Sequence, residues 1–233
     1  MTDHYEQEAE VEQLRKWLRE NWFPIVSGLA LGLAAIFGWQ GWMQHRDMHA
    51  GDASHVFMDL DQAASLGKYD EVKAMADRLV KDFSDTPYAA AGALRLAQMA
   101  VENGKLDEAA ARLHWVVDFE QHPGVSARVA ALVHLRGQAN DPALLPLARL
   151  RLAQVLWQQN QPAEALQQLE GDAGSYASLY AELRGDIKLS QGDRAAARGA
   201  YQEALQSLAP NAVGRDGLER KLADLADVAT VRS

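Results

Sequence analysis

The feature that most constrains this chain is an uninterrupted run without a charged side chain, from Asn21 to Gln44. A helix that crosses a membrane needs about 20 predominantly apolar residues, whereas a core helix of a soluble domain usually keeps a polar face. Between Ile25 and Phe37 the only polar side chain belongs to Ser27. The run therefore predicts a transmembrane helix over residues 21–44 that contacts membrane lipid.

Tryptophans near both ends of the run distinguish an anchor from a cleaved signal peptide. The apolar core of a signal peptide is typically about 7–15 residues long and ends at a small-residue cleavage site. This run is longer; it ends with Trp39 and Trp42, and Trp22 marks its start. Tryptophan is enriched at membrane interfaces, and a helix from Trp22 to Trp42 is ~30 Å long, which matches the hydrocarbon layer. We expect an uncleaved anchor with Trp22, Trp39 and Trp42 at the two interfaces.

The predicted span also contains Gly28 and Gly32 in a G-x-x-x-G arrangement. Such a pair allows a second membrane helix to approach closely, which makes both glycines candidate packing residues. Glycine is also common in membrane helices that lack a helical partner, so the motif alone leaves both interpretations open.

The distribution of basic residues predicts the orientation of the anchor. Arg15, Lys16 and Arg19 precede the span, and only Arg46 follows it closely. Because Lys and Arg accumulate on the cytoplasmic side, residues 1–20 should form a cytoplasmic tail. Residues 45–233 should then lie outside the cytoplasm. In a Gram-negative cell the span would cross the inner membrane, and these residues would be in the periplasm.

The remainder of the chain contains an internal repeat. The pentapeptide LRLAQ begins at Leu94 and again at Leu150, and it is followed each time by a turn, at Gly104 and at Asn160. Similar turns occur at two further positions, Gly67 and Gly192. The tetratricopeptide repeat pairs two antiparallel helices over about 34 residues, so the pattern predicts about four helix pairs.

The best-matching unit covers residues 176–209 and has small residues where its two helices would touch. Gly185 takes the close-contact position of the first helix, and Ala197, Tyr201 and Ala204 fit the second. The spacing between the turns at Gly104 and Asn160 exceeds one repeat, which predicts an inserted helix at about 124–138. A final amphipathic segment at about 214–229 should cap the array. The predicted fold is all-α, with a transmembrane helix followed by a tetratricopeptide-like solenoid and a C-terminal capping helix.

The composition offers no support for enzymatic chemistry. The formal charge of −9 argues against nucleic acid as a partner, and the chain has no cysteine. No phosphate-binding loop, nucleophile elbow or zinc motif is present. His45 and His49 are four residues apart, with Asp52 and His55 nearby, but this spacing is common in helices and does not favour a metal site. We therefore expect neither catalytic residues nor cofactors.

The first helix of each repeat lines the concave side of such solenoids, so its inward side chains are candidates for a partner-binding groove. These residues are apolar, amide-bearing or acidic, which suits an apolar helix or an extended segment of a partner protein. Several of the leucines could equally be core residues, and Trp157 is the most informative position because a large aromatic side chain is often a binding anchor. The candidate groove residues are Leu94, Gln98, Val101, Leu150, Gln154, Trp157, Leu179, Glu182, Asp186 and Leu189.

Taken in order, these features resemble the YfgM family of ancillary SecYEG translocon subunits. The resemblance is carried by the acidic start YEQEAEVEQLRKW, by GWQGW at the end of the span, and above all by LRGDIKLSQGDRAAARGAY from Leu183 to Tyr201. It implies association with the SecYEG translocon and with a membrane-anchored periplasmic chaperone, PpiD. The implied role is a non-enzymatic scaffold that passes translocated proteins to periplasmic folding factors.

Two other functions remain open at the level of sequence. The protein could be a general adaptor for envelope assembly that does not contact the translocon. It could also be a regulator that acts through its cytoplasmic tail, which alternates the glutamates Glu6, Glu8, Glu10 and Glu12. Acidic segments of this kind are usually only solvated.

Overall fold

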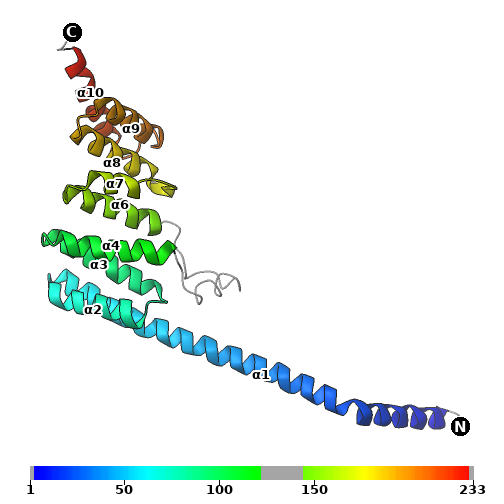
Figure 1. The fold of residues 1–233 in the computed structure, drawn as a ribbon. Coiled ribbons are helices and arrows are strands. Elements are labelled where there is room, and N and C mark those ends of the chain that lie inside the picture. The colour runs from blue at the N-terminus through cyan, green and yellow to red at the C-terminus, as the bar shows by residue number, and fades with distance from the viewer. Residues whose placement is uncertain (1–2, 122–143, 231–233) are drawn as a thin grey trace. The chain divides into compact units, whose positions relative to one another are not determined.

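The computed structural model describes residues 3–121 and 144–230, and these residues form helices without any strand. The elements are α1 (Asp3–Ser65), α2 (Tyr69–Asp82), α3 (Pro87–Glu102), α4 (Leu106–Gln121), α6 (Leu144–Gln158), α7 (Pro162–Gln168), the 3₁₀ turn η1 (Gly174–Tyr176), α8 (Ala177–Ser190), α9 (Arg194–Gln206) and α10 (Arg215–Thr230) (Figure 1). The all-α prediction is confirmed. The chain divides into two units, Met1–Asp52 and Ala53–Ser233.

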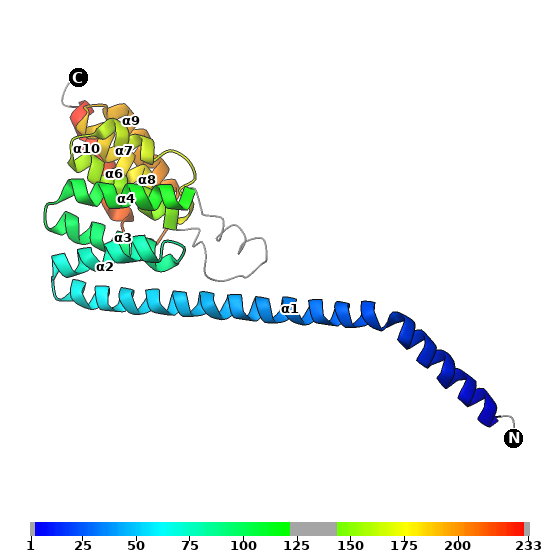
Figure 2. The same ribbon diagram turned by 60° about the horizontal axis from the view of Figure 1, so that its bottom comes forward.

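The first unit consists of the greater part of α1. Among the described residues, one helix is long and apolar enough to cross a membrane, within Asn21–Ser65, and its apolar portion is exposed. Pro24 lies inside α1, and Figure 2 shows that the N-terminal part of this helix is bent. Proline removes a backbone hydrogen bond from the helix, which is the usual cause of such a bend.

The second unit is a stack of helix pairs. Residues 53–65 of α1 pack with α2, and the next pairs are α3 with α4, α6 with α7, and α8 with α9 (Figures 1 and 2). Small side chains occupy the contacts between the helices. In α3 these include Ala89, Ala90 and Ala93, all fully buried. The predicted tetratricopeptide-like array is therefore confirmed.

Four turns within the pairs share one backbone conformation. Gly67, Gly104 and Gly192 have φ values of 70°, 71° and 82°, and Asn160 takes the same place with φ 62°. In each turn, the amide of the following residue donates to a carbonyl five residues earlier, as from Lys105 to Ala100 over 2.8 Å. Glycine adopts this left-handed conformation without steric cost, and asparagine is the side chain that best tolerates it.

The fourth pair contains a close approach of its two helices. A Cβ atom on Gly185 of α8 would overlap the ring of Tyr201 in α9. Tyr201, Ala197 and Ala204 are completely buried on the facing side of α9. The sequence assigned all four residues to this contact, and the structure confirms the assignment.

The end of the array is covered by α10, whose Leu218 and Leu225 are buried against α8 and α9. The predicted capping helix is thereby confirmed. The predicted helix at about 124–138 lies outside the described residues, between α4 and α6. The third pair differs from the others because its second helix, α7, has only seven residues.

Candidate partner-binding surface

The ten predicted groove residues lie on α3, α6 and α8, and the structure gives them unequal exposure. Leu179 and Leu189 of α8 are the most open of the apolar ones, with 48% and 36% of their surface exposed. Leu94 and Val101 are half-buried, and Leu150 is only 3% exposed. Leu150 therefore belongs to the hydrophobic core and not to the candidate surface.

Trp157 occupies an intermediate position near the end of α6. It is partly buried and packs against the core cluster that contains Leu156 and Val155. Removing its indole would therefore cost packing as well as any contact with a partner. This makes Trp157 a poorer test position than the two exposed leucines of α8.

The amide side chains on this surface are held by neighbouring arginines. Gln98 accepts a hydrogen bond from Arg95 over 3.0 Å and donates to Glu102 over 2.9 Å. Gln154 accepts in the same way from Arg151 over 3.1 Å. The two LRLAQ segments thus place one Arg–Gln pair on α3 and one on α6. Both amides are oriented and still partly accessible, so they can hydrogen-bond to an incoming chain.

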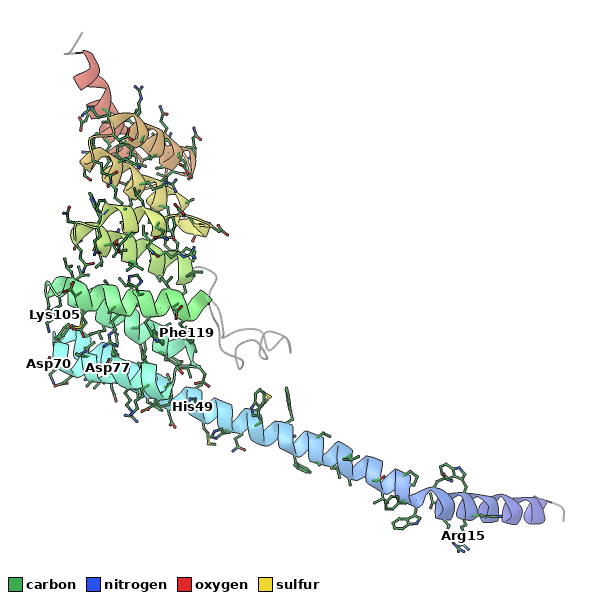
Figure 3. All side chains as sticks on the ribbon, viewed as in Figure 1. Arg15, His49, Asp70, Asp77, Lys105 and Phe119 are labelled. Atoms are coloured by element: carbon green, nitrogen blue, oxygen red, sulfur yellow. The ribbon has the colours of Figure 1, made fainter. Side chains whose placement is uncertain are left out.

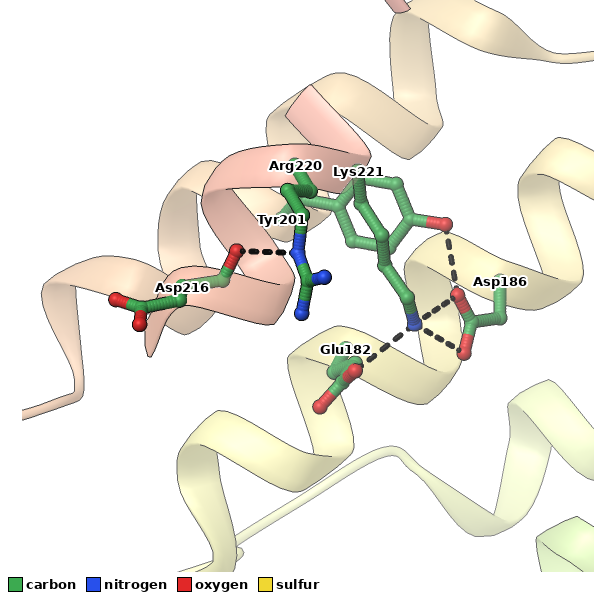
Figure 4. A network of polar contacts seen from close by, with 6 residues as sticks. All are labelled: Glu182, Asp186, Tyr201, Asp216, Arg220 and Lys221. Carbon is green, nitrogen blue, oxygen red and sulfur yellow. Dashed lines mark hydrogen bonds and ion pairs between the residues drawn. The ribbon is translucent and has the colours of Figure 1, made fainter. Parts of the chain in front are cut away.

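The acidic pair on α8 is already engaged by a lysine from α10. Lys221 Nζ lies 2.8 Å from Glu182 Oε1 and 2.7 Å from Asp186 Oδ1 (Figure 4). The hydroxyl of Tyr201 donates to the same Asp186 oxygen over 2.7 Å. Sequence reasoning found the two carboxylates but missed Lys221. Its position three residues after Leu218 and four before Leu225 would have placed it on the inner face of the capping helix.

The pKa values of this cluster follow from burial and pairing. Burial by itself would lower the pKa of Lys221, but its hydrogen bonds to Asp186 and Glu182 outweigh that effect and hold the pKa above its usual value. Burial and the hydrogen bond to Asp186 both raise the pKa of Tyr201. At neutral pH the lysine is therefore charged and the phenol neutral, so that the lysine can pair with both carboxylates.

A second polar cluster joins the second helices of the first two repeats. Glu108 on α4 accepts from Tyr69 and from Lys73 on α2, each over 2.6 Å. Arg112 lies 2.6 Å from Asp77, which Figure 3 labels. Glu108 lies in the first turn of α4, and its contacts with α2 join the first repeat to the second.

The remaining sequence candidates lie on α1. Among the described residues, no group of three or more His, Asp or Glu side chains could hold a metal ion. Trp22, Trp39 and Trp42 are 56%, 43% and 41% exposed on α1, and Trp39 and Trp42 contact each other with ring centroids 5.3 Å apart. Gly28 and Gly32 have open space where a Cβ atom would lie, so no described residue packs closely against either glycine.

The comparisons with known proteins agree with this architecture. The family model of the tetratricopeptide repeat-like domain matches residues 15–136 and 125–227. A protein of Escherichia coli K12 named "Ancillary SecYEG translocon subunit" is 32% identical over 205 residues, covering 87% of this chain and 89% of that protein. Proteins of the same name from Haemophilus influenzae and Neisseria gonorrhoeae are 29% and 24% identical and cover 87% and 97% of this chain, and 90% and 100% of their own length.

Among solved structures, one match is titled "Crystal structure of BtubC (BKLC) from P. vanneervenii". It is 14% identical, has a TM-score of 0.45, and covers 79% of this chain and 84% of that one.

The stacked helix pairs and their left-handed turns, together with the family match, define a tetratricopeptide repeat-like protein. It carries one apolar N-terminal helix that indicates a membrane anchor. The chain belongs to the family of ancillary SecYEG translocon subunits.

Proposed function

We propose that this protein is a non-enzymatic ancillary subunit of a SecYEG translocon, anchored in the inner membrane with its repeat domain in the periplasm. The observation that carries the proposal is the similarity to proteins named for this role, which extends over both the apolar helix and the repeats. The span would contact lipid and the translocon, and the repeat domain would bind partner proteins.

The partner proposed for the repeat domain is a membrane-anchored periplasmic chaperone of the PpiD type. The exposed Leu179 and Leu189 and the oriented Gln98 and Gln154 support a surface that combines apolar contacts with hydrogen bonds to a polypeptide. Such a surface would hold the chaperone close to the translocon exit, so that an emerging chain passes from one to the other. No step of this role needs bond chemistry.

Site-specific photocrosslinking in intact membranes tests the proposal. A photoreactive residue at the exposed Leu31 of the span should crosslink to a translocon subunit, and one at Leu179 should crosslink to a chaperone. The fully exposed Val213, in the loop after α9, provides the control position and should give neither product. Chaperone crosslinks without translocon crosslinks would favour the general envelope adaptor instead.

The possibility of regulation through the cytoplasmic tail is tested separately. Deleting residues 2–12 removes the alternating glutamates and leaves Arg15, Lys16 and Arg19 in place to orient the span. The proposed role requires that both crosslinks survive this deletion. Their loss, with the protein still present in the membrane, would favour the regulator.

A further inference from the structure

The cluster around Lys221 has two parts: a host formed by α8 and α9, and an occupant, which is the capping helix α10. Glu182 and Asp186 belong to α8, and Tyr201 belongs to α9. The 2.7 Å hydrogen bond from Tyr201 to Asp186 orients this carboxylate without any help from α10. The capping helix contributes only the cation that sits between the two acids. Asp186 therefore has a contact that holds its orientation independently of Lys221.

The occupant is an amphipathic helix with a distinct sequence pattern. Leu218, Leu222 and Leu225 face the cluster of α8 and α9, and Lys221 lies on the same side between them. The pattern is Leu-x-x-Lys-Leu-x-x-Leu. Its leucines cover Ala181, Ala197, Tyr201 and Ala204.

Polar contacts hold α10 at a few points. Arg194 donates to the carbonyl of Asp224 over 3.2 Å, and Lys221 supplies the ion pairs. The side chains of Lys221, Glu182 and Asp186 are 35%, 31% and 26% exposed. The loop between α9 and α10 contains the completely exposed Val213 and a glycine, Gly214, with φ 96°.

We propose that the cluster of Glu182, Asp186 and Tyr201 is a docking site for a partner helix that carries an apolar stripe with a lysine in it, and that α10 occupies the site until such a helix displaces it. The capping helix is then an internal competitor that regulates access to the end of the candidate surface. This inference rests on the proposed function only in assigning the site to partner binding.

The complementary charges and the seated segment identify the kind of partner. A helix without a cation would leave Glu182 without its ion-pair partner and Asp186 with only Tyr201, and a polar helix would leave the alanine-lined face uncovered. An extended peptide would satisfy neither condition as well as a helix with leucines at i, i+4 and i+7 and lysine at i+3, since this spacing places all four side chains on one helical face.

The test uses the full chain in detergent micelles and a fluorescent peptide of residues 214–230. The wild-type chain should bind the peptide weakly, because its own α10 is tethered at an effective concentration of about millimolar. Lys221→Gln in the chain should tighten peptide binding about tenfold. The variant's own α10 loses its charge-assisted hydrogen bonds to Glu182 and Asp186, whereas the peptide keeps its lysine and can still form them. A peptide with glutamine at the position of Lys221 should not show this tenfold tighter binding. The same loss is expected when the full-length chain also carries Glu182→Gln and Asp186→Asn.

Hydrogen exchange supplies a second readout that also works on the wild-type chain. Saturating unlabelled peptide should speed exchange of the amides of α10 about tenfold and leave α8 and α9 protected. If Lys221→Gln unfolds α8 and α9 together with α10, or if excess peptide leaves α10 protected in the wild type, α10 is only a stabilising cap and the proposal is wrong. No translocon or chaperone is present in this assay, so its failure is distinct from failure of the photocrosslinking experiment.

Discussion

Gly185 is the residue on which the packing of the fourth repeat depends most directly. A Cβ atom added to this glycine would overlap the ring of Tyr201. That ring is buried, and its hydroxyl is hydrogen-bonded to Asp186. A rigid ring cannot yield as the end of an aliphatic side chain can. At Gly92, by contrast, the nearest atom to an added Cβ is the terminal Cδ1 of Leu79.

Gly185→Ala should therefore lower the free energy of unfolding by about 2 kcal/mol, as expected for overpacking in a core. Gly199→Ala provides the matched control, because Gly199 lies in α9 with nothing within 4 Å of the added Cβ. It should stabilise the helix by up to ~1 kcal/mol. Urea unfolding of both variants checks the prediction, and equal effects would contradict it.

Asn160 is the exception among the four turn residues, since the other three are glycines. Its φ of 62° is tolerated by asparagine at some steric cost. Asn160→Gly should raise the melting temperature slightly or leave it unchanged, whereas Asn160→Val should cost about 1–2 kcal/mol because a β-branched residue resists this conformation. Thermal unfolding measures both, and a destabilising glycine together with a neutral valine would refute the argument.

Glu108 links stability to pH through its contacts between repeats. Its hydrogen bonds with Lys73, and secondarily with Tyr69, hold the pKa of the carboxyl below its usual value. A carboxyl with a depressed folded-state pKa stabilises the fold above its unfolded pKa, and the contribution disappears as the pH falls through the folded-state pKa. The pKa of Lys73 is raised by the same pair, so that its contribution is lost only at strongly basic pH.

Glu108→Gln should therefore reduce the free energy of unfolding by about 1 kcal/mol near pH 7, and the difference from the wild type should narrow below about pH 4. Glu71→Gln is the control, because Glu71 makes an ion pair with Lys68 in which both side chains are about half exposed. It should have little effect at either pH. A deficit of Glu108→Gln that persists unchanged at pH 3 would show that the charge is not its cause.

At the scale of the helix, α8 concentrates the accessible part of the candidate surface. Its two exposed leucines flank the acidic pair, and neither belongs to a buried cluster. The combined change Leu179→Ser and Leu189→Ser should weaken capture of a periplasmic partner about tenfold or more without lowering the melting temperature, because exposed anchors contribute to binding and not to folding. Val213→Ser serves as the control for a loss of exposed apolar surface.

Quantitative pull-down from solubilised membranes provides the measurement for the α8 variant. Unchanged capture would move the partner site away from α8. A drop in both capture and melting temperature would mean that the two leucines contribute to the fold, and the pull-down could then not be attributed to a lost contact.

Helix pairs were predictable from sequence because their signals are local. The turns at Gly67, Gly104, Asn160 and Gly192 repeat at a fixed place in the pattern, and the small residues opposite Tyr201 lie within one repeat. Each of these depends only on neighbouring residues.

The roles of individual side chains on the helices were less predictable. A helical pattern tells which residues share a face, but the burial of Leu150 depends on which neighbours cover that face. The partners of Lys221 are 35 and 39 residues away, and those of Glu108 are at similar separations. Such pairs are decided by the placement of whole helices, which no local pattern contains.

At the scale of the whole molecule, the anchor and the repeats imply a defined topology. The Lys and Arg residues that precede the span predict a cytoplasmic N-terminus and a C-terminus outside the cytoplasm. A reporter that is active only outside the cytoplasm, fused after Ser233, should be active. Changing Arg15, Lys16 and Arg19 to glutamine should reduce this activity by weakening the orientation signal. An inactive wild-type fusion would refute the predicted topology.

The consecutive packing of the helices has a consequence for how the domain is made. Each helix from α2 to α10 finds its main partner in a helix adjacent to it along the described chain, so most packing contacts join segments that are close in sequence. Low contact order permits rapid folding, and a repeat can gain structure once its successor is present. A chain that is threaded through a membrane from one end could thus fold one pair at a time behind its own anchor, and α10 would complete the array last.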